Sequence, residues 1–303
     1  MRSGVSGDVA ADNVGVASRF VADGRPTNDL PAWVIGVMNG GGCEFTPRDH
    51  GMCEWELPGS KPWTRGLSAH RLLARSMVQS DWTGLGDELY SLVLESCRRS
   101  REQVVRWWCF VPDIGAPVAS GLDRYMALNV GRHAAHERRS LNAGALAAAS
   151  CVGHAGDAVV LHAIVTKADV TAIENPRQTP AWRYSSEFGP QPPAFARAVR
   201  VGGDGGAIVV SGTASVRGEA TVHEGEFAAQ CDETRENLTA ILAAGRPGVG
   251  LSNVTHARIY VANHAMLPAA HRAFATLGAA REFLVAPLCR RNLFVEVEAY
   301  VEP

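Results

Sequence analysis

The last strand-like segment of the chain carries two carboxylates that could do acid–base chemistry. Residues 294–301 alternate in polarity, and Glu296 and Glu298 fall on the same face of the strand that this pattern predicts. A carboxyl buried in a pocket has a raised pKa, so it stays protonated and can act as a general acid. The solvent-facing side of an antiparallel sheet gives the same pattern, and periodicity alone favours that simpler interpretation. Cys289 lies just upstream, followed by two arginines.

A pair of arginines in the first half of the chain could hold a dicarboxylate. Arg124 and Arg132 lie eight residues apart in a segment of helical periodicity, and Tyr125 adjoins the first of them. Just over two helical turns separate them, so both could project from one face. Each guanidinium can bind a carboxylate through two hydrogen bonds. From the spacing alone, two exposed arginines on an amphipathic helix are the simpler interpretation.

Residues 174–199 predict a long ordered loop, because prolines interrupt them too often for a helix or a strand. Tyr184 and Arg197 belong to this loop and could close over an anionic ligand. Packing of the loop by its own aromatic side chains explains the sequence equally well. The segment SGTAS at 211–215, which contains Ala214, ends a predicted strand. It could expose backbone N–H groups to a ligand or be an ordinary polar strand end.

Neither a metal site nor a disulfide framework is indicated. The seven cysteines are scattered without a CxxC pair, and His133 and His136 lack a distant third ligand. The net charge of −2, without a lysine-rich run, does not favour nucleic acid or an anionic membrane as a partner. No apolar run approaches the ~20 residues of a membrane span, and the N-terminus has no signal-peptide core. We expect a cytoplasmic protein with free thiols.

The elements that must position these residues follow an α+β pattern, with helices on one face of a mixed sheet. We expect a polar N-terminal arm at 1–30, an α+β lobe at 31–150 and a second lobe at 151–303. A hairpin is expected from 145–153 and 157–167. Helices are predicted at 85–103, 122–139, 225–245 and 266–278, and further strands at 33–39, 104–114, 207–216, 256–263, 281–287 and 293–301.

Several of these segments, taken in order, resemble the chorismatase family. They are VVRWWCFVPDI, LDRYMALNVGRHAA, ENPRQTPAWRY, SGTASVRGEATVHEGEFAAQCDETRENL and LCRRNLFVEVEAYV, which together span roughly residues 100–300. The second half, especially SGTAS and VEVEA, is also similar to the YjgF/RidA superfamily. The resemblance implies a RidA-like (chorismate-mutase-like) α+β fold of two related lobes, with the catalytic domain at 151–303 and no cofactor or metal.

Chorismatases cleave the enolpyruvyl ether of chorismate and release pyruvate, so the resemblance implies a bacterial enzyme of this reaction. In the family pattern Glu296 matches the acid that protonates the enolpyruvyl methylene, and Glu298 is structural. The residues that match substrate-binding positions are Arg124, Tyr125 and Arg132, with Tyr184 and Arg197 in the loop that completes the pocket.

Two residues point to different branches of that family. Cys289, seven residues before Glu296, resembles the branch that forms 3-hydroxybenzoate, whereas Ala214 resembles the hydrolytic branch, which forms a trans-dihydroxycyclohexadiene carboxylate. We give the thiol more weight, because a reactive group near the ring can steer the intermediate. A 3-hydroxybenzoate synthase of secondary metabolism is therefore expected. The alternatives are the hydrolytic enzyme, a 4-hydroxybenzoate-forming variant, a RidA-type imine deaminase and a non-catalytic small-molecule binder. For the oligomeric state, both a monomer and a homotrimer stay open.

Overall fold

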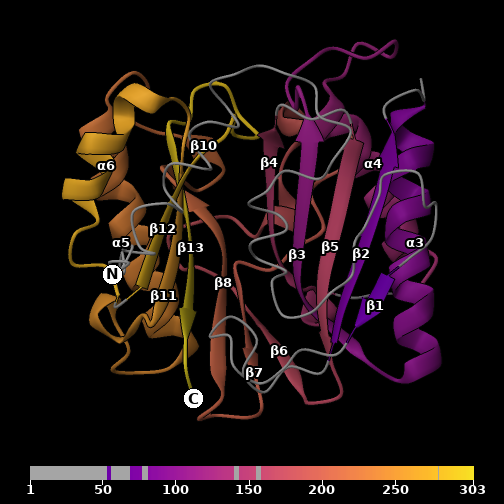
Figure 1. Ribbon diagram of the computed structural model, residues 1–303, viewed down its shortest axis with the longest axis horizontal. Coiled ribbons are helices and arrows are strands. Elements are labelled where there is room, and N and C mark those ends of the chain that lie inside the picture. Colours follow the sequence, from indigo (N-terminus) through magenta and orange to yellow (C-terminus); the bar gives the residue numbers. More distant parts are fainter. Residues whose placement is uncertain (1–52, 56–68, 77–80, 140–142, 155–157, 279) are drawn as a thin grey trace, which may run out of the picture.

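The computed structural model describes residues 53–55, 69–76, 81–139, 143–154, 158–278 and 280–303. The arm expected at 1–30 and the strand expected at 33–39 lie outside these residues. The described part forms four layers, in which two β-sheets face each other and helices cover the outer face of each sheet (Figure 1). The α+β class, with helices packed on one face of mixed sheets, is therefore confirmed.

The first sheet has the strand order β1–β2–β5–β3–β4 and is covered by α3 and α4. The bounds of its elements are β1 (Cys53–Trp55), β2 (Ala69–Ser76), α3 (Trp82–Ser100), β3 (Gln103–Pro112), α4 (Arg124–Glu137), β4 (Ala148–His154) and β5 (Ala158–Thr166).

Helix α4 is fixed in position by a cap and by a close helix crossing. The carboxylate of Asp123 accepts the backbone N–H of Met126, which satisfies one of the free donors at the start of the helix. Gly131 lets α4 approach α3 closely, because a Cβ atom there would lie 2.1 Å from the carbonyl oxygen of Thr83. Tyr125 and Arg132 therefore project from a rigid helix.

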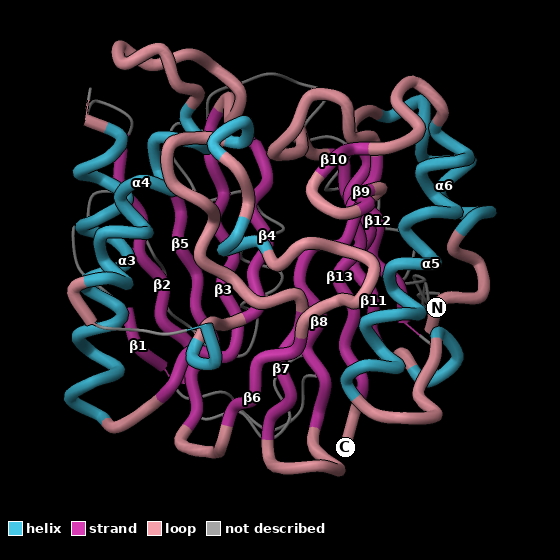
Figure 2. Tube along the Cα trace, turned by 180° about the vertical axis from the view of Figure 1, so that it is seen from behind, coloured by secondary structure: helices cyan, strands magenta, loops and turns pink. Residues whose placement is uncertain are grey.

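The second sheet has the order β12–β11–β13–β8–β7–β6, and α5 and α6 cover its outer face. The two outer helix pairs lie at opposite flanks of the molecule, as the view from behind also shows (Figure 2). The bounds are β6 (Val170–Ile173), β7 (Ala198–Val201), β8 (Ala207–Ala214), β9 (Val216–Arg217), β10 (Ala220–Thr221), α5 (Phe227–Gly245), β11 (His256–Val261), α6 (Leu267–Ala273), β12 (Ala280–Val285) and β13 (Val295–Val301).

The inner faces of the two sheets meet along one shared core. It contains Trp108 and Phe110 of β3, Val209 of β8, and Tyr300 of β13, which are all buried. The hydroxyl of Ser211 on β8 accepts the backbone N–H of Ala149 on β4 at 2.8 Å, so the two sheets are also joined by hydrogen bonds. A strand of the second sheet therefore has two buried faces, one toward its helices and one toward the first sheet.

One expectation about strand organisation was wrong. Strands β4 and β5 do not form a hairpin, because β3 lies between them and pairs parallel with β4 and antiparallel with β5. The lobe boundary expected near residue 150 falls inside β4, whereas the change of sheet falls between Thr166 and Val170. We propose that the two lobes divide between Thr166 and Val170. Sequence periodicity identifies strands but not their partners, so neither feature was visible in it.

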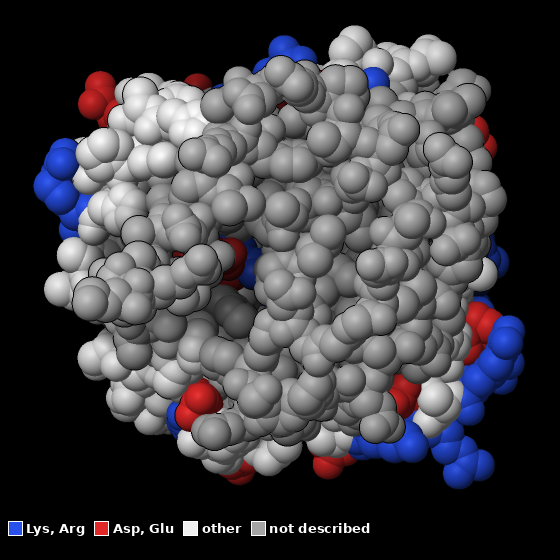
Figure 3. Space-filling model, in the orientation of Figure 1, with Lys and Arg blue, Asp and Glu red and all other residues white. Residues whose placement is uncertain are grey.

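Surface charge, helix hydropathy and the state of the thiols match what the sequence predicts. Charged side chains of both signs lie around the periphery of the face shown in Figure 3. Within the described residues, none of the helices is long and apolar enough to cross a membrane. Five cysteines are free thiols, namely Cys97, Cys109, Cys151, Cys231 and Cys289.

Candidate active site

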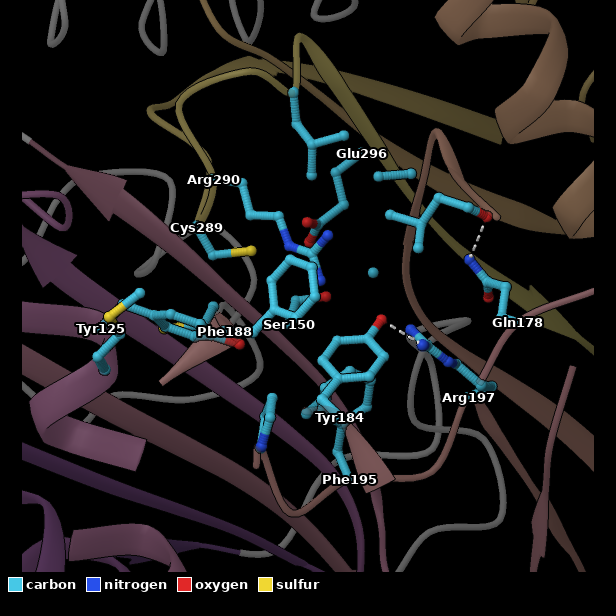
Figure 4. Close-up of a pocket in the computed structure, with 18 of the residues that line it drawn as sticks. Tyr125, Ser150, Gln178, Tyr184, Phe188, Phe195, Arg197, Cys289, Arg290 and Glu296 are labelled. Carbon is cyan, nitrogen blue, oxygen red and sulfur yellow. Dashed lines mark hydrogen bonds between the residues drawn. The ribbon is translucent and has the colours of Figure 1, made fainter. Parts of the chain in front are cut away.

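A pocket lies where the two sheets and the loop between β6 and β7 meet (Figure 4). Its volume is about 790 Å³, a value that includes the solvent at its open mouth. Its walls come from helix α4, strands β4, β8 and β13, and the segment before β13. The residues that line it are Tyr125, Met126, Arg132, Ala149, Ser150, Cys151, Gln178, Tyr184, Phe188, Pro193, Phe195, Arg197, Gly212, Ala214, Val216, Cys289, Arg290, Leu293 and Glu296.

Seven of the eight residues singled out from the sequence line this pocket, although they are far apart along the chain. The loop at 174–197 contains only two short 3-10 turns, and it supplies the phenol of Tyr184 and the guanidinium of Arg197. The seven residues are Tyr125, Arg132, Tyr184, Arg197, Ala214, Cys289 and Glu296.

Arg124 is the exception, because it does not line this pocket. Its Nη1 donates to the carbonyl oxygen of Pro112 at 2.7 Å and lies 3.3 Å from a carboxylate oxygen of Asp113. Its guanidinium lies over the ring of Trp82, 4.7 Å from the centroid. Eight residues at ~100° each leave the two arginines about 80° apart around the helix, so only one of them faces the pocket.

Glu296 is buried, with 4% of its surface exposed, and it faces the pocket from β13. Burial raises its pKa, and the negative charge of Glu298 raises it further, to about 8. The guanidinium of Arg106 and the hydroxyl of Ser150 act in the opposite direction but do not outweigh these effects. Glu296 therefore carries its proton at neutral pH, as a general acid must.

The interpretation of Glu296 and Glu298 as the wet side of a strand is wrong. Both carboxyls point into the space between the two sheets, where Glu298 has 0% of its surface exposed. The alternation of apolar and polar residues in β13 therefore marks two different buried faces. The apolar face, with Val295 and Val297, packs on α5 and α6, and the other carries the site.

Three guanidinium groups line the same pocket. Arg132 is buried, and its Nε and Nη2 have no hydrogen-bond partner among the described residues. The guanidinium of Arg132 lies 5.0 Å from the ring centroid of Tyr90 and 5.9 Å from that of Phe195. An arginine held between rings with free donors is preorganised to receive an anion, because its own hydrogen bonds are not spent on the protein.

Arg197 and Arg290 donate hydrogen bonds to uncharged oxygen atoms of the protein. Arg197 donates to the carbonyl of Thr179 at 2.8 Å and to the hydroxyl of Tyr184 at 2.5 Å. Arg290 donates to the carbonyl of Glu219 at 2.7 Å, and its guanidinium lies 4.0 Å from the ring centroid of Phe188. With Glu296 neutral, the lining of the pocket is positively charged, which favours a ligand with carboxylates.

The thiol of Cys289 is not activated in this structure. Burial raises its pKa, and the nearby Glu296 raises it further, to about 12. Cys289 is therefore a neutral thiol at physiological pH, rather than the thiolate that a directly nucleophilic cysteine would present.

Helix α5 holds the site together through side-chain amides. Asn237 donates from Nδ2 to the carbonyls of Ala214 at 3.0 Å and Val216 at 2.9 Å, and its Oδ1 accepts from Nε of Arg177 at 3.0 Å. It thus ties the end of β8 to the start of the loop at 174–197. Gln230 accepts the backbone N–H of Phe294 at 2.8 Å and donates to the carbonyl of Asn292, also at 2.8 Å.

Sequence reasoning missed several residues of the site. Ser150 and Gln178 have no motif of their own, and Arg290 was noted only as a neighbour of Cys289. Gly212, within SGTAS, had a signal that could have been used, since glycine in a strand often marks a close approach. A Cβ atom at Gly212 would lie 2.0 Å from Oε1 of Glu296, so only glycine leaves room for the carboxyl.

The histidines of α4 form no metal site. His136 is buried rather than solvated, its Nδ1 lies 2.9 Å from the carbonyl oxygen of Arg132, and burial lowers its pKa to about 3. Within the described residues, no group of three or more His, Cys, Asp or Glu side chains could hold a metal ion.

Comparison with known proteins finds relatives with this architecture. Residues 71–165 match the family model described as chorismatase FkbO/Hyg5-like, N-terminal. A chorismatase from Streptomyces rapamycinicus is 33% identical over 235 residues, which are 73% of this chain and 68% of that protein. A 3-hydroxybenzoate synthase from Streptomyces hygroscopicus is 33% identical over 214 residues, covering 65% of this chain and 63% of that protein.

One solved structure gives the same result for the fold. A crystal structure of a chorismatase aligns with 78% of this chain and 78% of its own, with a TM-score of 0.73 and 26% sequence identity. A RidA from an Antarctic Psychrobacter aligns with 44% of this chain and 99% of its own, with a TM-score of 0.34 and 18% identity. On the identity and coverage of the first relative, and on the fold that it shares with a solved chorismatase, the chain belongs to the chorismatase family of enzymes.

Proposed function

We propose that this enzyme cleaves the enolpyruvyl ether of chorismate, releasing pyruvate and forming 3-hydroxybenzoate. The observation that carries the proposal is the neutral, buried carboxyl of Glu296 in a pocket lined by three guanidinium groups. Chorismate carries two carboxylates and an enol ether that is labile to acid, so the pocket offers what that substrate requires. The names of the two Streptomyces relatives, chorismatase and 3-hydroxybenzoate synthase, support the same reaction.

The reaction begins with proton transfer from Glu296 to the methylene carbon of the enolpyruvyl group. The double bond supplies the electron pair of the new C–H bond, and the adjacent carbon becomes an oxocarbenium ion that shares its charge with the ether oxygen. The glutamate left behind is an anion beside this cation, which stabilises the charge as it develops. Water then adds to the oxocarbenium carbon, and the bond between that carbon and the ether oxygen breaks. Pyruvate leaves, and the oxygen stays on the ring as a hydroxyl group with a proton from the water.

The arginines fix the substrate so that its methylene lies over the acid. Arg132 has the free donors and the burial for one carboxylate, and Arg197 and Arg290 supply guanidinium groups for the other. Two fixed anchors define the orientation of a rigid ring, and an error of about 1 Å at the reacting carbon costs about 10²-fold in rate.

The nature of the product depends on the steps that come after ether cleavage. Hydrolysis consumes one water and gives a dihydroxycyclohexadiene carboxylate, whereas 3-hydroxybenzoate and pyruvate together contain only the atoms of chorismate. Aromatisation therefore requires the ring to lose a hydroxyl group and a proton. Cys289 and Ala214 both line the pocket, so each can contact the ring. Because the Cys289 thiol is neutral, it acts after Glu296 has given up its proton and become a base beside it.

Other functions make different use of the same pocket. The hydrolytic product, favoured by Ala214, and a 4-hydroxybenzoate-forming variant keep the acid and change only the later steps. A RidA-type imine deaminase does not need a pocket for two carboxylates, and a non-catalytic binder does not need a neutral acid. The described residues that line the pocket all come from one chain, which is compatible with a monomer and with a homotrimer. The five free cysteines support a cytoplasmic location.

The test of the product is incubation of the pure enzyme with chorismate, beside the variant Cys289→Ala. The wild type is expected to give pyruvate and 3-hydroxybenzoate in equal amounts. The variant is expected to keep pyruvate release within about 10-fold and to shift the aromatic product toward the dihydrodiol, because ether cleavage uses Glu296 and not the thiol. Liquid chromatography of the ring products and an enzymatic pyruvate assay measure both. An unchanged product in the variant would exclude a steering role for the thiol, and absence of pyruvate from the wild type would refute the function.

Replacing Arg132 and Arg124 by methionine tests which arginine binds substrate. Arg132→Met is expected to lower kcat/KM for chorismate by about 10²-fold, because it removes charge-assisted hydrogen bonds to a carboxylate. Arg124→Met is the matched control and should stay within about threefold of wild type, since its partners are Pro112, Asp113 and the Trp82 ring. Equal losses in both variants would contradict the assignment of the anion site to Arg132 alone.

A further inference from the structure

Directly beneath Glu296, a buried ion pair bridges the two sheets. Oε1 of Glu298 on β13 lies 3.0 Å from Nη2 of Arg106 on β3, and both side chains have 1% of their surface exposed. Nε1 of Trp108, two residues along β3, donates to Oε2 of Glu298 at 2.8 Å. Nη1 of Arg258 on β11 lies 3.8 Å from the same oxygen. Glu298 is thus held in its ionised form by neighbours from two strands.

Stability is a poor explanation for this ion pair. Removing two charges from water costs free energy that their attraction repays only in part, so packed apolar side chains of similar size are often at least as stable. The core around the ion pair is mainly apolar, with Trp108 and Tyr300 among the largest buried side chains and the ring of His162 stacked on that of Trp108, at 5.0 Å between centroids. A charged pair at this position, next to a carboxyl that faces the pocket, therefore points to a role in the chemistry of that carboxyl.

Ser150 connects the ion pair with the acid. Nη2 of Arg106 donates to Oγ of Ser150 at 2.6 Å, and its Nη1 donates to the carbonyl of Val210 at 2.7 Å, so the guanidinium is locked in place. Because Oγ accepts from Arg106, its own hydrogen is free to point elsewhere. The hydroxyl and the carboxyl of Glu296 are neighbours, since a Cβ at Gly212 would lie 2.7 Å from Oγ and 2.0 Å from Oε1. Both face the pocket (Figure 4).

We propose that Glu298, Arg106 and Ser150 form a unit that positions Glu296. The fixed negative charge of Glu298 keeps the proton on the carboxyl of Glu296. The Ser150 hydroxyl, oriented by Arg106, directs the same carboxyl into the pocket. This proposal rests on the proposed function only for the transfer of the Glu296 proton to the substrate. Glu298 and Arg106 line no part of the pocket, so they act through Glu296 and not on the substrate.

The groups around Glu296 act in opposite directions. Glu298, on its own strand, disfavours a second negative charge, and the thiol of Cys289 in the segment before β13 is neutral. From the first sheet, Arg106 and the hydroxyl of Ser150 favour the ionised form. From β11, Tyr260 pairs with Glu296 in the strand register, and Arg258 acts mainly on Glu298 and Glu282. Arg132, Arg197 and Arg290 line the same pocket.

This balance predicts pH shifts of opposite sign in two variants. Glu298→Gln removes the charge that retains the proton, so the pH at which kcat/KM for chorismate falls on the alkaline side should move down by about one unit or more. Ser150→Ala removes a hydrogen bond that favours the anion, so the same limb should move up. A residue that merely supports the fold would lower activity at all pH values without moving the limb.

The matched control is Glu282→Gln, which removes the same charge at the outer end of the network. Glu282 on β12 accepts from Nε of Arg258 at 2.7 Å and is not part of the pocket. Without it, Arg258 still neighbours Glu298, so the alkaline limb should stay within about 0.3 unit of wild type. Circular dichroism checks that each variant is folded. Ser150→Ala, which changes no charge, keeps the test available if Glu298→Gln does not fold.

A second readout separates this proposal from the proposed function. The infrared C=O stretch of the protonated Glu296 carboxyl, identified as the band lost in Glu296→Gln, is followed as a function of pH without substrate. The proposal expects this titration to shift down in Glu298→Gln and up in Ser150→Ala, even if the wild type releases no pyruvate from chorismate. A titration that is unchanged in both variants, or that moves in the same direction in both, would overturn it.

Discussion

Replacing Glu296 by glutamine should lower kcat for pyruvate release from chorismate by about 10³-fold, because glutamine has no proton to give to the enolpyruvyl methylene. The amide occupies nearly the same space as the neutral acid, so binding of chorismate, measured by calorimetry, should stay within about threefold of wild type. Pyruvate is followed continuously with lactate dehydrogenase. Glu88→Gln, an exposed position on α3, is the control for the change of side chain itself.

The pH dependence of the wild type has a defined sign. Glu296 is active when protonated, and its pKa is raised to about 8, so kcat/KM should be level near neutral pH and fall as the pH rises beyond about 8. A glutamate with an ordinary pKa would already be ionised at neutral pH and would show its loss of activity in the acid range. If Glu296→Gln kept its turnover and only raised KM, the residue would be a binding group and the proton would come from elsewhere.

Substituting Gly212 by alanine should lower kcat by about 10²-fold although no catalytic group is removed. The added Cβ would lie 2.0 Å from Oε1 and 2.5 Å from Cδ of Glu296, so the carboxyl must leave its position. Overpacking of this kind costs about 1–3 kcal/mol of folding stability, which thermal unfolding would detect.

The control for this substitution is Gly205→Ala, in the turn before β8. No heavy atom lies within 4 Å of a Cβ built there, so both stability and turnover should remain close to wild type. If Gly212→Ala turned over chorismate as fast as Gly205→Ala, the position of the Glu296 carboxyl would not matter to the rate, and its assignment as the acid would lose its geometric basis.

Local elements of this fold could be predicted from the sequence, because they depend on local patterns. The helices at 82–100 and 227–245 and the strands at 103–112 and 295–301 lie within a few residues of their predicted bounds. The arrangement of the strands could not be predicted. β3 enters between β4 and β5, and β13 meets β3 across the inter-sheet core, and both placements depend on contacts between distant parts of the chain.

The same limit explains the errors at the site. The sequence of β13 does not show whether its polar face meets water or a second sheet. Glu296 and Glu298 therefore fitted the solvent-exposed face of a strand. Arg124 and Arg132 were expected on one face of the helix because eight residues are close to two full turns. The remaining rotation of about 80° separates the two side chains. Ser150 carries no motif, since its role comes from a hydrogen bond to Arg106, forty-four residues away. The family resemblance supplied seven pocket residues, but the cause of the raised pKa of Glu296 required the packed structure.

The most direct test of the central claim is the hydrogen content of the pyruvate formed from chorismate in D₂O. A carboxyl of Glu296 exchanges its proton with solvent, so the methylene carbon should receive one deuterium, and pyruvate trapped at once as lactate should have one deuterium in its methyl group. Pyruvate incubated under the same conditions without enzyme controls for exchange after release. A methyl group without deuterium would show that the hydrogen came from the substrate ring, and it would contradict protonation by Glu296.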